Sequence, residues 1–205
     1  VLKFGGSSLG TPERIKGVKD IIKSKSLPCI VVVSAFEGVT DKLLQIAGLA
    51  SGGKTEYREN LDKLISGHRE FASKLISKSD DLNEAQKYID DIANELGEIL
   101  KGLFLLREST KHALEQVLAS GERISSRIIS LFLEDSLYLD SRELIRTEGK
   151  AGNAIVDFTT TNSLIRSALE NTGKLVILPG YIASNHKGDT TTLGRGGSDY
   201  TAAII

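Results

Sequence analysis

The segment Cys29–Val33 constrains the fold more than any other part of the chain, because its residues are all apolar and mostly β-branched. Such a run without polar alternation is typical of a strand buried on both faces of a parallel sheet. A β-rich segment, Val1–Phe4, a glycine turn from Gly5 and a helical pattern from Thr11 precede it. Strand, turn, helix and buried strand form a βαβ unit. The sequence therefore predicts an α/β fold with a mainly parallel central sheet and helices on both of its faces.

The spacing of apolar residues further along the chain predicts alternating helices and strands. Helices are expected at 41–50, 57–107, 115–134 and 161–170, and strands at 137–139 and 174–182. A polar stretch at 77–81 divides the second helix into an α-hairpin, and the third helix is either interrupted or begun near Gly121. We therefore predict a three-layer α/β/α sandwich in one domain over 1–205, with a helical excursion at about 57–110. A last helix starts at Ser198 and is expected to be truncated at the C-terminus.

Composition excludes several classes of protein. Of the 205 residues, 40% are hydrophobic and 26% charged, as in ordinary soluble domains. The net charge of −1 gives no reason to expect a nucleic-acid or membrane partner. No apolar run approaches the roughly 20 residues of a transmembrane helix. A single cysteine, Cys29, rules out an internal disulfide. These features predict a cytoplasmic protein.

The segment Gly48–Thr55 matches the P-loop pattern, but its context does not fit. A phosphate-binding P-loop connects a strand to a helix, whereas the residues before Gly52 have helical periodicity. We interpret the glycines as the end of a helix and a loop.

The turn after the first predicted strand, Lys3–Ser8, is a better candidate for an anion site. Glycines between a strand and a helix let the backbone approach an anion closely. Lys3 would place an ammonium group at the edge where open α/β sheets bind ligands. The alternative is a tight turn with a solvated lysine, and the position of Lys3 in a buried strand favours a function.

Two further segments leave both interpretations open. Val33–Thr40 follows the buried strand at the same edge and offers the hydroxyls of Ser34 and Thr40, but Thr40 is equally suited to be a helix N-cap. Ser120–Ser126 is expected to open a helix. Glu122 in it either complements the helix dipole or projects into the cleft and binds a cation.

The segment Thr190–Tyr200 carries the strongest functional signal. Three glycines surround Arg195, whose guanidinium suits bidentate recognition of a carboxylate or phosphate. Ser198 and Asp199 then begin a helix, where Ser198 is a candidate cap and Asp199 is able to face a cation. By contrast, the dispersed histidines and Cys29 show no spacing typical of a metal site, and no metal-binding residue is predicted.

These segments, taken in order, resemble those of the aspartokinases in the amino-acid-kinase superfamily. The likeness covers nearly the whole chain and includes Asp140–Thr147 and Gly152–Val156 besides the segments above. Ser7 stands where that family usually has threonine, and the hydroxyl is kept. The resemblance implies transfer of a phosphoryl group from ATP, with Mg²⁺, to the β-carboxylate of L-aspartate. It also implies a homo-oligomer, a dimer, in the full-length enzyme, in some relatives fused to a homoserine dehydrogenase.

The same resemblance implies roles for individual residues. Lys3 and Asp199 are the catalytic pair, with Asp199 orienting Lys3 and the metal-nucleotide. The phosphates would be bound by Lys3, Gly5, Gly6, Ser7 and Ser198. Aspartate would be bound by Ser34, Thr40, Glu122 and Arg195. The nucleophile is a carboxylate with a pKa of ~4, ionised at neutral pH, so no general base is required.

Two other functions remain open at this point. The first is another amino-acid kinase, acting on acetylglutamate or glutamate, although such a kinase need not carry the segment around Arg195 or the region of Glu122 in this form. In the aspartokinases the segments that cradle adenine follow this region, so a fragment that binds aspartate without holding ATP is the second alternative.

Overall fold

The computed structural model describes residues 1–170 and 172–205. Its strands are β1 (Leu2–Phe4), β2 (Cys29–Val33), β3 (Leu137–Tyr138), β4 (Arg146–Lys150), β5 (Asn153–Val156), β6 (Leu175–Pro179), β7 (Ile182–Asn185) and β8 (Thr190–Thr192). Its helices are a 3₁₀ turn η1 (Gly6–Leu9) and α1 (Pro12–Lys23), α2 (Val39–Ser51), α3 (Tyr57–Leu75), α4 (Ser79–Leu106), α5 (Lys111–Phe132), α6 (Ser141–Leu144), α7 (Phe158–Leu169) and α8 (Gly197–Ile204).

The parallel sheet predicted from Cys29–Val33 is present. Its strands lie in the order β1-β2-β6-β3 and are all parallel. Successive side chains of β2 enter different cores: Val31 and Val33 pack with the first half of the chain, whereas Val32 packs with the second half. Because neighbouring residues of a strand point to opposite faces, both faces of this sheet are covered, which explains why the whole run is apolar.

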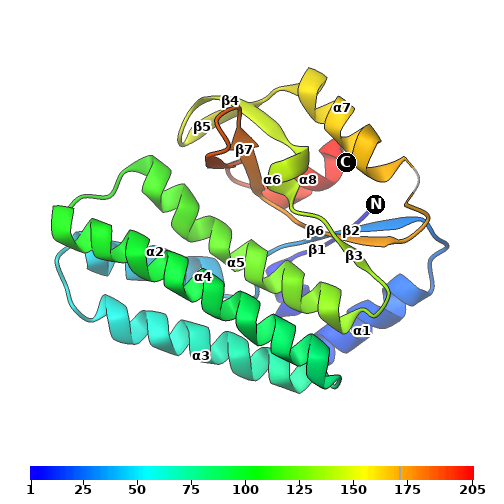
Figure 1. Cartoon of the computed structure of the whole chain (residues 1–205), viewed down its shortest axis with the longest axis horizontal. Helices are drawn as coiled ribbons and strands as arrows, with labels where there is room; N and C mark the ends of the chain where they lie inside the picture. The colour runs from blue at the N-terminus through cyan, green and yellow to red at the C-terminus, as the bar shows by residue number, and fades with distance from the viewer. Residues whose placement is uncertain (171) are drawn as a thin grey trace.

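Helices and a second sheet form the outer layers. Helices α2, α3, α4 and α5 gather on one side of the parallel sheet, while β4, β5, β7 and α7 lie on the other (Figure 1). The predicted α/β fold with a parallel sheet is confirmed. The second sheet, in the order β5-β4-β7-β8, was not predicted. Its strand β4 reads Arg-Thr-Glu-Gly-Lys and lacks the apolar alternation that would have indicated a strand.

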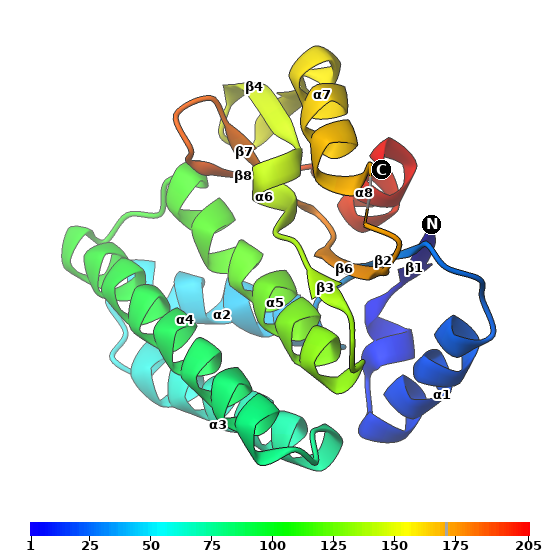
Figure 2. The same cartoon turned by 45° about the vertical axis from the view of Figure 1, so that its right-hand side comes forward.

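The helical excursion is also confirmed as an α-hairpin. Helices α3 and α4 lie side by side in both views and are divided at residues 76–78 (Figure 2). Helix α1 begins as its sequence predicts, because the Thr11 hydroxyl accepts a hydrogen bond from the Arg14 amide at 3.3 Å and Pro12 follows Thr11. None of the helices in the described part of the chain combines the length and apolarity that a membrane crossing requires.

Two element predictions were wrong. The expected strand 174–182 is two strands of different sheets, since β6 ends at Pro179 and β7 begins at Ile182. Between them Tyr181 has a left-handed backbone with φ of 69°. The expected break near Gly121 is absent, because α5 runs through it to Phe132. Glu122 therefore lies in the middle of a helix.

Candidate active site

A cavity of about 380 Å³ opens where the carboxyl ends of β1 and β2 meet helices α5 and α8. It is lined by Lys3, Ser34, Thr40, Glu122, Tyr181 and residues 194–199. A neighbouring cavity of about 350 Å³ shares three of these residues and adds Gly6 and Ser7. Segments that are far apart in the sequence thus converge at the sheet edge where α/β folds bind ligands.

Lys3 and Asp199 form an ion pair across this edge. The Lys3 Nζ lies 3.0 Å from Asp199 Oδ1, and the side chains are 26% and 71% exposed. Lys3 is brought there by its parallel pairing beside Val32, and Asp199 by its place in the first turn of α8. The pair stands at the mouth of the cavity, where an anionic ligand would meet the ammonium group.

The glycine turn after β1 packs against the loop after β2. A Cβ on Gly6 would lie 3.2 Å from the Ala35 carbonyl oxygen, so a side chain there would be crowded by backbone. Gly6 and Ser7 line the neighbouring cavity, while Gly5 lies beside the Lys3 ammonium.

The loop after β2 presents Ser34, and the first turn of α2 presents Thr40, to both cavities. Gly38, with φ of 74°, is the N-cap of α2 and turns the chain sharply. Thr40 lies inside the helix, so its interpretation as an N-cap was wrong. The Ser34 carbonyl accepts a hydrogen bond from Ser125 Oγ of α5 at 2.8 Å, which fixes the loop to that helix.

Glu122 is a buried carboxylic acid in the middle of α5. It is 5% exposed, and its Oε2 has no hydrogen-bond partner in the described part of the chain. Burial disfavours the charged form and raises the pKa of Glu122 to about 8. The helix-dipole interpretation was wrong, because Glu122 is about three turns from the helix start at Lys111. A carboxyl group that lines a cavity and keeps one oxygen without a partner is suited to receive a cation.

The glycine–arginine segment connects β8 to α8. Gly194 and Gly196 both have φ of 73°, a conformation that favours glycine, and Gly196 is the N-cap of α8. Arg195 between them is exposed and lines the cavity. Ser198 lies within the first turn and makes no capping hydrogen bond, so its predicted role as a cap was wrong.

The whole chain matches a sequence-family model described as "Amino acid kinase family", over residues 1–205. The chain belongs to the amino acid kinase family. It is 32% identical to lysine-sensitive aspartokinase 3 of Escherichia coli, a match that covers 100% of this chain and 45% of the relative. It is 29% identical to bifunctional aspartokinase/homoserine dehydrogenase 1 of Arabidopsis thaliana, with 100% of this chain and 23% of that protein covered. The chain thus spans less than half the length of these relatives.

Solved structures show the same likeness. The crystal structure of E. coli aspartokinase III in complex with lysine and aspartate matches with a TM-score of 0.88 at 28% identity, covering 99% of this chain and 45% of that one. The structure of the same enzyme in complex with aspartate and ADP matches with a TM-score of 0.87 at 28% identity and the same coverage. The amino-acid-kinase fold expected from the sequence is confirmed.

Tyr181 is a residue of this amino-acid-kinase cavity that the sequence analysis missed. Its strained backbone is held because its amide donates to Thr201 Oγ1 at 2.9 Å and its carbonyl accepts from the Leu193 amide at 2.8 Å. Left-handed non-glycine residues often mark functional sites. The only signal in the sequence was the Pro-Gly pair just before it.

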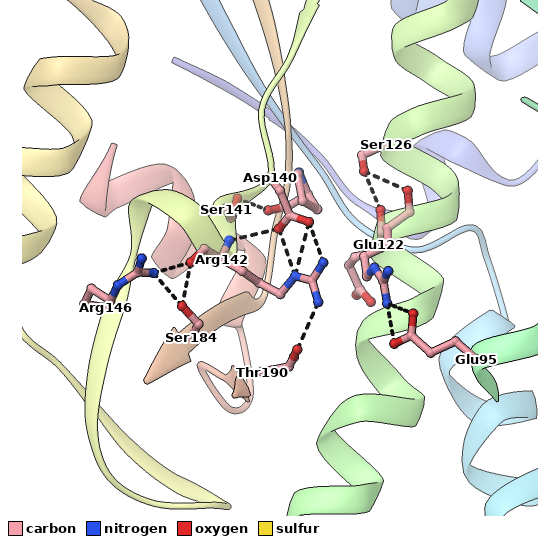
Figure 3. A network of polar contacts seen from close by, with 11 residues as sticks. Glu95, Glu122, Ser126, Asp140, Ser141, Arg142, Arg146, Ser184 and Thr190 are labelled. Atoms are coloured by element: carbon pink, nitrogen blue, oxygen red, sulfur yellow. Dashed lines mark hydrogen bonds and ion pairs between the residues drawn. The ribbon is translucent and has the colours of Figure 1, made fainter. Parts of the chain in front are cut away.

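A polar network supports the strands that lead into the glycine–arginine segment (Figure 3). Arg142 is paired with Asp140 at 2.7 Å and donates to Thr190 Oγ1 of β8 at 3.0 Å. Arg146 donates to Ser184 Oγ of β7 at 2.5 Å. The position of β8, and hence of Arg195, is therefore set by side chains from the α6–β4 region.

A buried carboxylate on α5 holds the same strand from its other side. Glu115 Oε1 accepts hydrogen bonds from the Thr192 amide at 3.3 Å, from Thr192 Oγ1 at 3.0 Å and from the Gly152 amide at 3.0 Å. Helix α5 thus carries both a cavity residue, Glu122, and an anchor for the segment opposite.

The segment Gly48–Thr55, which matches the P-loop pattern, forms the end of α2 and the turn after it. Gly52 is the C-cap of this helix, so the interpretation of the glycines as a helix end and a loop is confirmed.

A group of possible metal ligands lies elsewhere in the structure, although no metal-binding residue was predicted. His186 Nε2 lies 3.4 Å from Asp157 Oδ2 and 3.9 Å from Glu148 Oε1. The ligand atoms of these three residues lie within 4.8 Å of one another, outside the cavity.

Proposed function

We propose that this chain is the N-terminal part of an amino-acid-kinase catalytic domain that transfers the γ-phosphoryl group of ATP to the β-carboxylate of L-aspartate. The product is 4-phospho-L-aspartate. One observation carries the proposal: Lys3, Arg195 and Glu122, an acid without an ion pair among the described residues, line one cavity of about 380 Å³. These groups match the charges of a phosphate, a carboxylate and an ammonium group.

The acceptor would be held between α5 and the glycine–arginine segment. We assign the α-carboxylate to Arg195, because a guanidinium binds a carboxylate through two parallel hydrogen bonds. We assign the α-ammonium to Glu122. A bound ammonium would favour the charged form of this acid and lower its pKa from about 8, completing an ion pair in the buried wall. Ser34 and Thr40 line the same space and offer hydroxyls to the substrate.

The phosphates would lie between Lys3 and Ser198 of this cavity and the glycine turn Gly5, Gly6 and Ser7 of the neighbouring one. Lys3 would stabilise charge on the phosphoryl group as it moves, and its 3.0 Å contact with Asp199 would orient it. Phosphoryl transfer needs positioning and charge stabilisation more than proton transfer, and the ionised acceptor needs no base.

Mg²⁺ fits this arrangement through Asp199. Mg²⁺ in kinases is bound by one or two carboxylates together with phosphate oxygens. Asp199 is such a carboxylate, 71% exposed at the cavity mouth. When bound, the ion would neutralise phosphate charge, while Lys3 would keep its place at the carboxyl end of β1.

Similarity to known proteins supports this assignment. The two E. coli aspartokinase III structures bind aspartate, and one of them also binds ADP. The relatives are aspartokinases, which supports a role in amino-acid biosynthesis, and we propose that this role leads to the aspartate-derived amino acids lysine, threonine and methionine. We also propose that the full-length protein forms a dimer and lies in the cytoplasm. The Arabidopsis thaliana relative is a chloroplastic protein, so microscopy of the tagged full-length protein tests the location.

Isothermal titration of the chain with L-aspartate, L-glutamate and N-acetyl-L-glutamate tests the acceptor. We expect saturable binding of L-aspartate alone, and a coupled assay of ADP release should respond to the same ligand in a protein that turns over. Equal binding of the three acids would refute the assignment. Titration with ATP and Mg²⁺ separates a complete nucleotide site from a fragment that binds aspartate only.

A further inference from the structure

A third cavity, of about 210 Å³, shares Phe36 and Glu37 of the loop after β2 with the 350 Å³ cavity of the candidate site. It is formed between α3, the start of α2 and the loop after β2, and its lining includes Phe36, Glu37, Lys42, Lys63, His68 and Phe71. Pockets for drug-sized ligands usually measure roughly 300–1,000 Å³. A ligand of this cavity must therefore be small, about the size of one ring with its substituents.

His68 gives the cavity a hydrogen-bond acceptor. The side chain is 4% exposed, and its Nδ1 lies 2.8 Å from the Leu64 carbonyl oxygen. A carbonyl only accepts, so Nδ1 carries the proton and, in the neutral ring, Nε2 carries a lone pair. Burial, together with the charge of Lys42, lowers the pKa of His68 and favours that neutral ring. Nε2 has no partner in the described part of the chain, so a ligand donor would satisfy it.

Aromatic rings and one cation supply the rest of the wall. The ring of Phe36 lies 4.3 Å from that of Phe71 and 5.8 Å from that of His68, between centroids. Among the charged lining residues, Glu37 pairs with Arg14 at 3.2 Å and Lys63 pairs with Glu59 at 2.6 Å. Lys42 remains as the cation with no ion pair among the described residues, and its charge acts on His68.

We propose that this cavity binds a small aromatic carboxylate that carries a hydrogen-bond donor on its ring. The ring packs against Phe36 and Phe71, the carboxylate meets Lys42, and the donor reaches His68 Nε2. We choose an anionic ligand because Lys42 is a cation without an ion pair among the described residues. We choose a ligand with a hydroxyl or amino substituent because His68 Nε2 is an acceptor without a donor in the described part of the chain. Phe36 and Glu37 lie between Ser34 and Thr40 in the sequence and line both this cavity and the 350 Å³ cavity of the candidate site, so the ligand contacts the segment that the candidate active site uses. This binding does not depend on the proposed kinase activity.

Three probe ligands and two variants test the proposal by nuclear magnetic resonance titration of the chain. The probes are 3-hydroxybenzoate, 3-methoxybenzoate, which lacks the donor, and 3-hydroxybenzyl alcohol, which lacks the charge. We expect 3-hydroxybenzoate to bind with a Kd on the order of 1 mM, as a ligand of about ten heavy atoms does. Each of the other two probes should bind about fivefold more weakly.

Two variants test which residue causes each loss of affinity. His68→Phe keeps a ring and should abolish the preference for hydroxyl over methoxy, while Lys42→Ala should abolish the preference for the acid over the alcohol. Lys150→Ala, an exposed lysine of β4, should preserve both preferences. If His68→Phe does not fold, Lys42→Ala and the probe comparison on the unaltered chain still decide. Lack of saturable binding, or equal affinity for the three probes, would overturn the proposal.

Discussion

Two carboxylates reach the candidate active site from regions with opposite surroundings. Glu122 stands in the middle of α5, 5% exposed and without a partner for Oε2 in the described chain. Asp199 stands in the first turn of α8, with a side chain 71% exposed and an ammonium group 3.0 Å away. The same chemical group, a carboxyl, is therefore buried in the wall of the cavity at Glu122 and exposed to solvent at its opening at Asp199.

The difference separates two tasks. A buried charge without a partner is costly, so the α5 wall favours a ligand that brings a cation with it. An ion pair exposed to solvent contributes little to the free energy of unfolding, so its two groups can bind a ligand instead of each other. We therefore associate the α5 region with recognition of the acceptor and the α8 region with anionic ligands that compete for Lys3.

The largest expected effect is on the pH dependence of stability through Glu122. Its folded pKa of about 8 lies above the usual 4.5, so stability present at acid pH is lost as pH rises between these values. At about 1.4 kcal/mol per unit, and allowing for water in the cavity, the loss between pH 5 and pH 8 should be on the order of 3 kcal/mol. Glu122→Gln, which does not titrate, should lack this loss.

Urea unfolding at pH 5 and pH 8 measures the difference, with Asp199→Asn as the exposed control. Asp199→Asn should keep the pH dependence of the unaltered chain. If the free energy of unfolding changes equally with pH in Glu122→Gln and in the unaltered chain, Glu122 is ionised in the folded protein at both pH values. The proposed contrast in protonation between Glu122 and Asp199 would then be wrong.

Arg195→Ala should give the next largest effect, on ligand binding. The guanidinium is exposed between two left-handed glycines, so its removal should leave the fold intact. Loss of a bidentate carboxylate contact should raise the Kd of L-aspartate about 100-fold, equivalent to roughly 2.7 kcal/mol. Isothermal titration checks this, with Arg166→Ala, an exposed arginine of α7, as the control. A weaker affinity for ATP with unchanged affinity for aspartate would assign Arg195 to the nucleotide instead.

Gly180→Ala should loosen the connection of α8 to the sheet. A Cβ at Gly180 would lie 2.6 Å from the Ser198 Cβ, closer than side chains approach one another. Such overpacking should lower the free energy of unfolding by about 1–2 kcal/mol. Gly17→Ala is the matched control, because a Cβ there meets no atom within 4 Å and helix propensity should raise stability by up to about 1 kcal/mol. Thermal unfolding of both variants measures the effect. Equal free energies of unfolding for the two variants would show that α8 shifts to accommodate the added methyl group without cost.

The features that could be predicted from the sequence depend on local periodicity or on glycines next to charge. The apolar run Cys29–Val33 identified the parallel sheet, since it is buried on both faces. Lys3 and the segment around Arg195 were recognised because a charged residue beside glycines at a sheet edge is unusual in a purely structural loop. The structure brings them into one cavity, although their roles stay predictions.

The features that could not be predicted depend on contacts across the chain. Gly121 suggested a helix start, yet a Cβ there would lie 3.0 Å from the Ala35 Cβ, so the glycine allows α5 to approach the loop after β2 closely. The apolar residues at 174–182 hid the change of sheet at Gly180, where a Cβ would lie 2.6 Å from the Ser198 Cβ. Neither contact leaves a local pattern in the sequence.

Asp199→Asn should have the smallest effect on stability, although the residue faces the same cavity as Glu122. Its ion pair with Lys3 is solvated, so its loss should change the free energy of unfolding by no more than about 0.5 kcal/mol. Nucleotide binding should respond much more, because Lys3 loses the group that orients it. Urea unfolding and titration with ATP and Mg²⁺ measure the two effects on one variant, with Asp189→Asn, in the β7–β8 turn, as a control for removal of an acid. A decrease in the free energy of unfolding well above about 0.5 kcal/mol would show that the Lys3–Asp199 ion pair stabilises the fold. The proposed division between a buried acceptor site at Glu122 and a solvent-exposed nucleotide site at Asp199 would then be wrong.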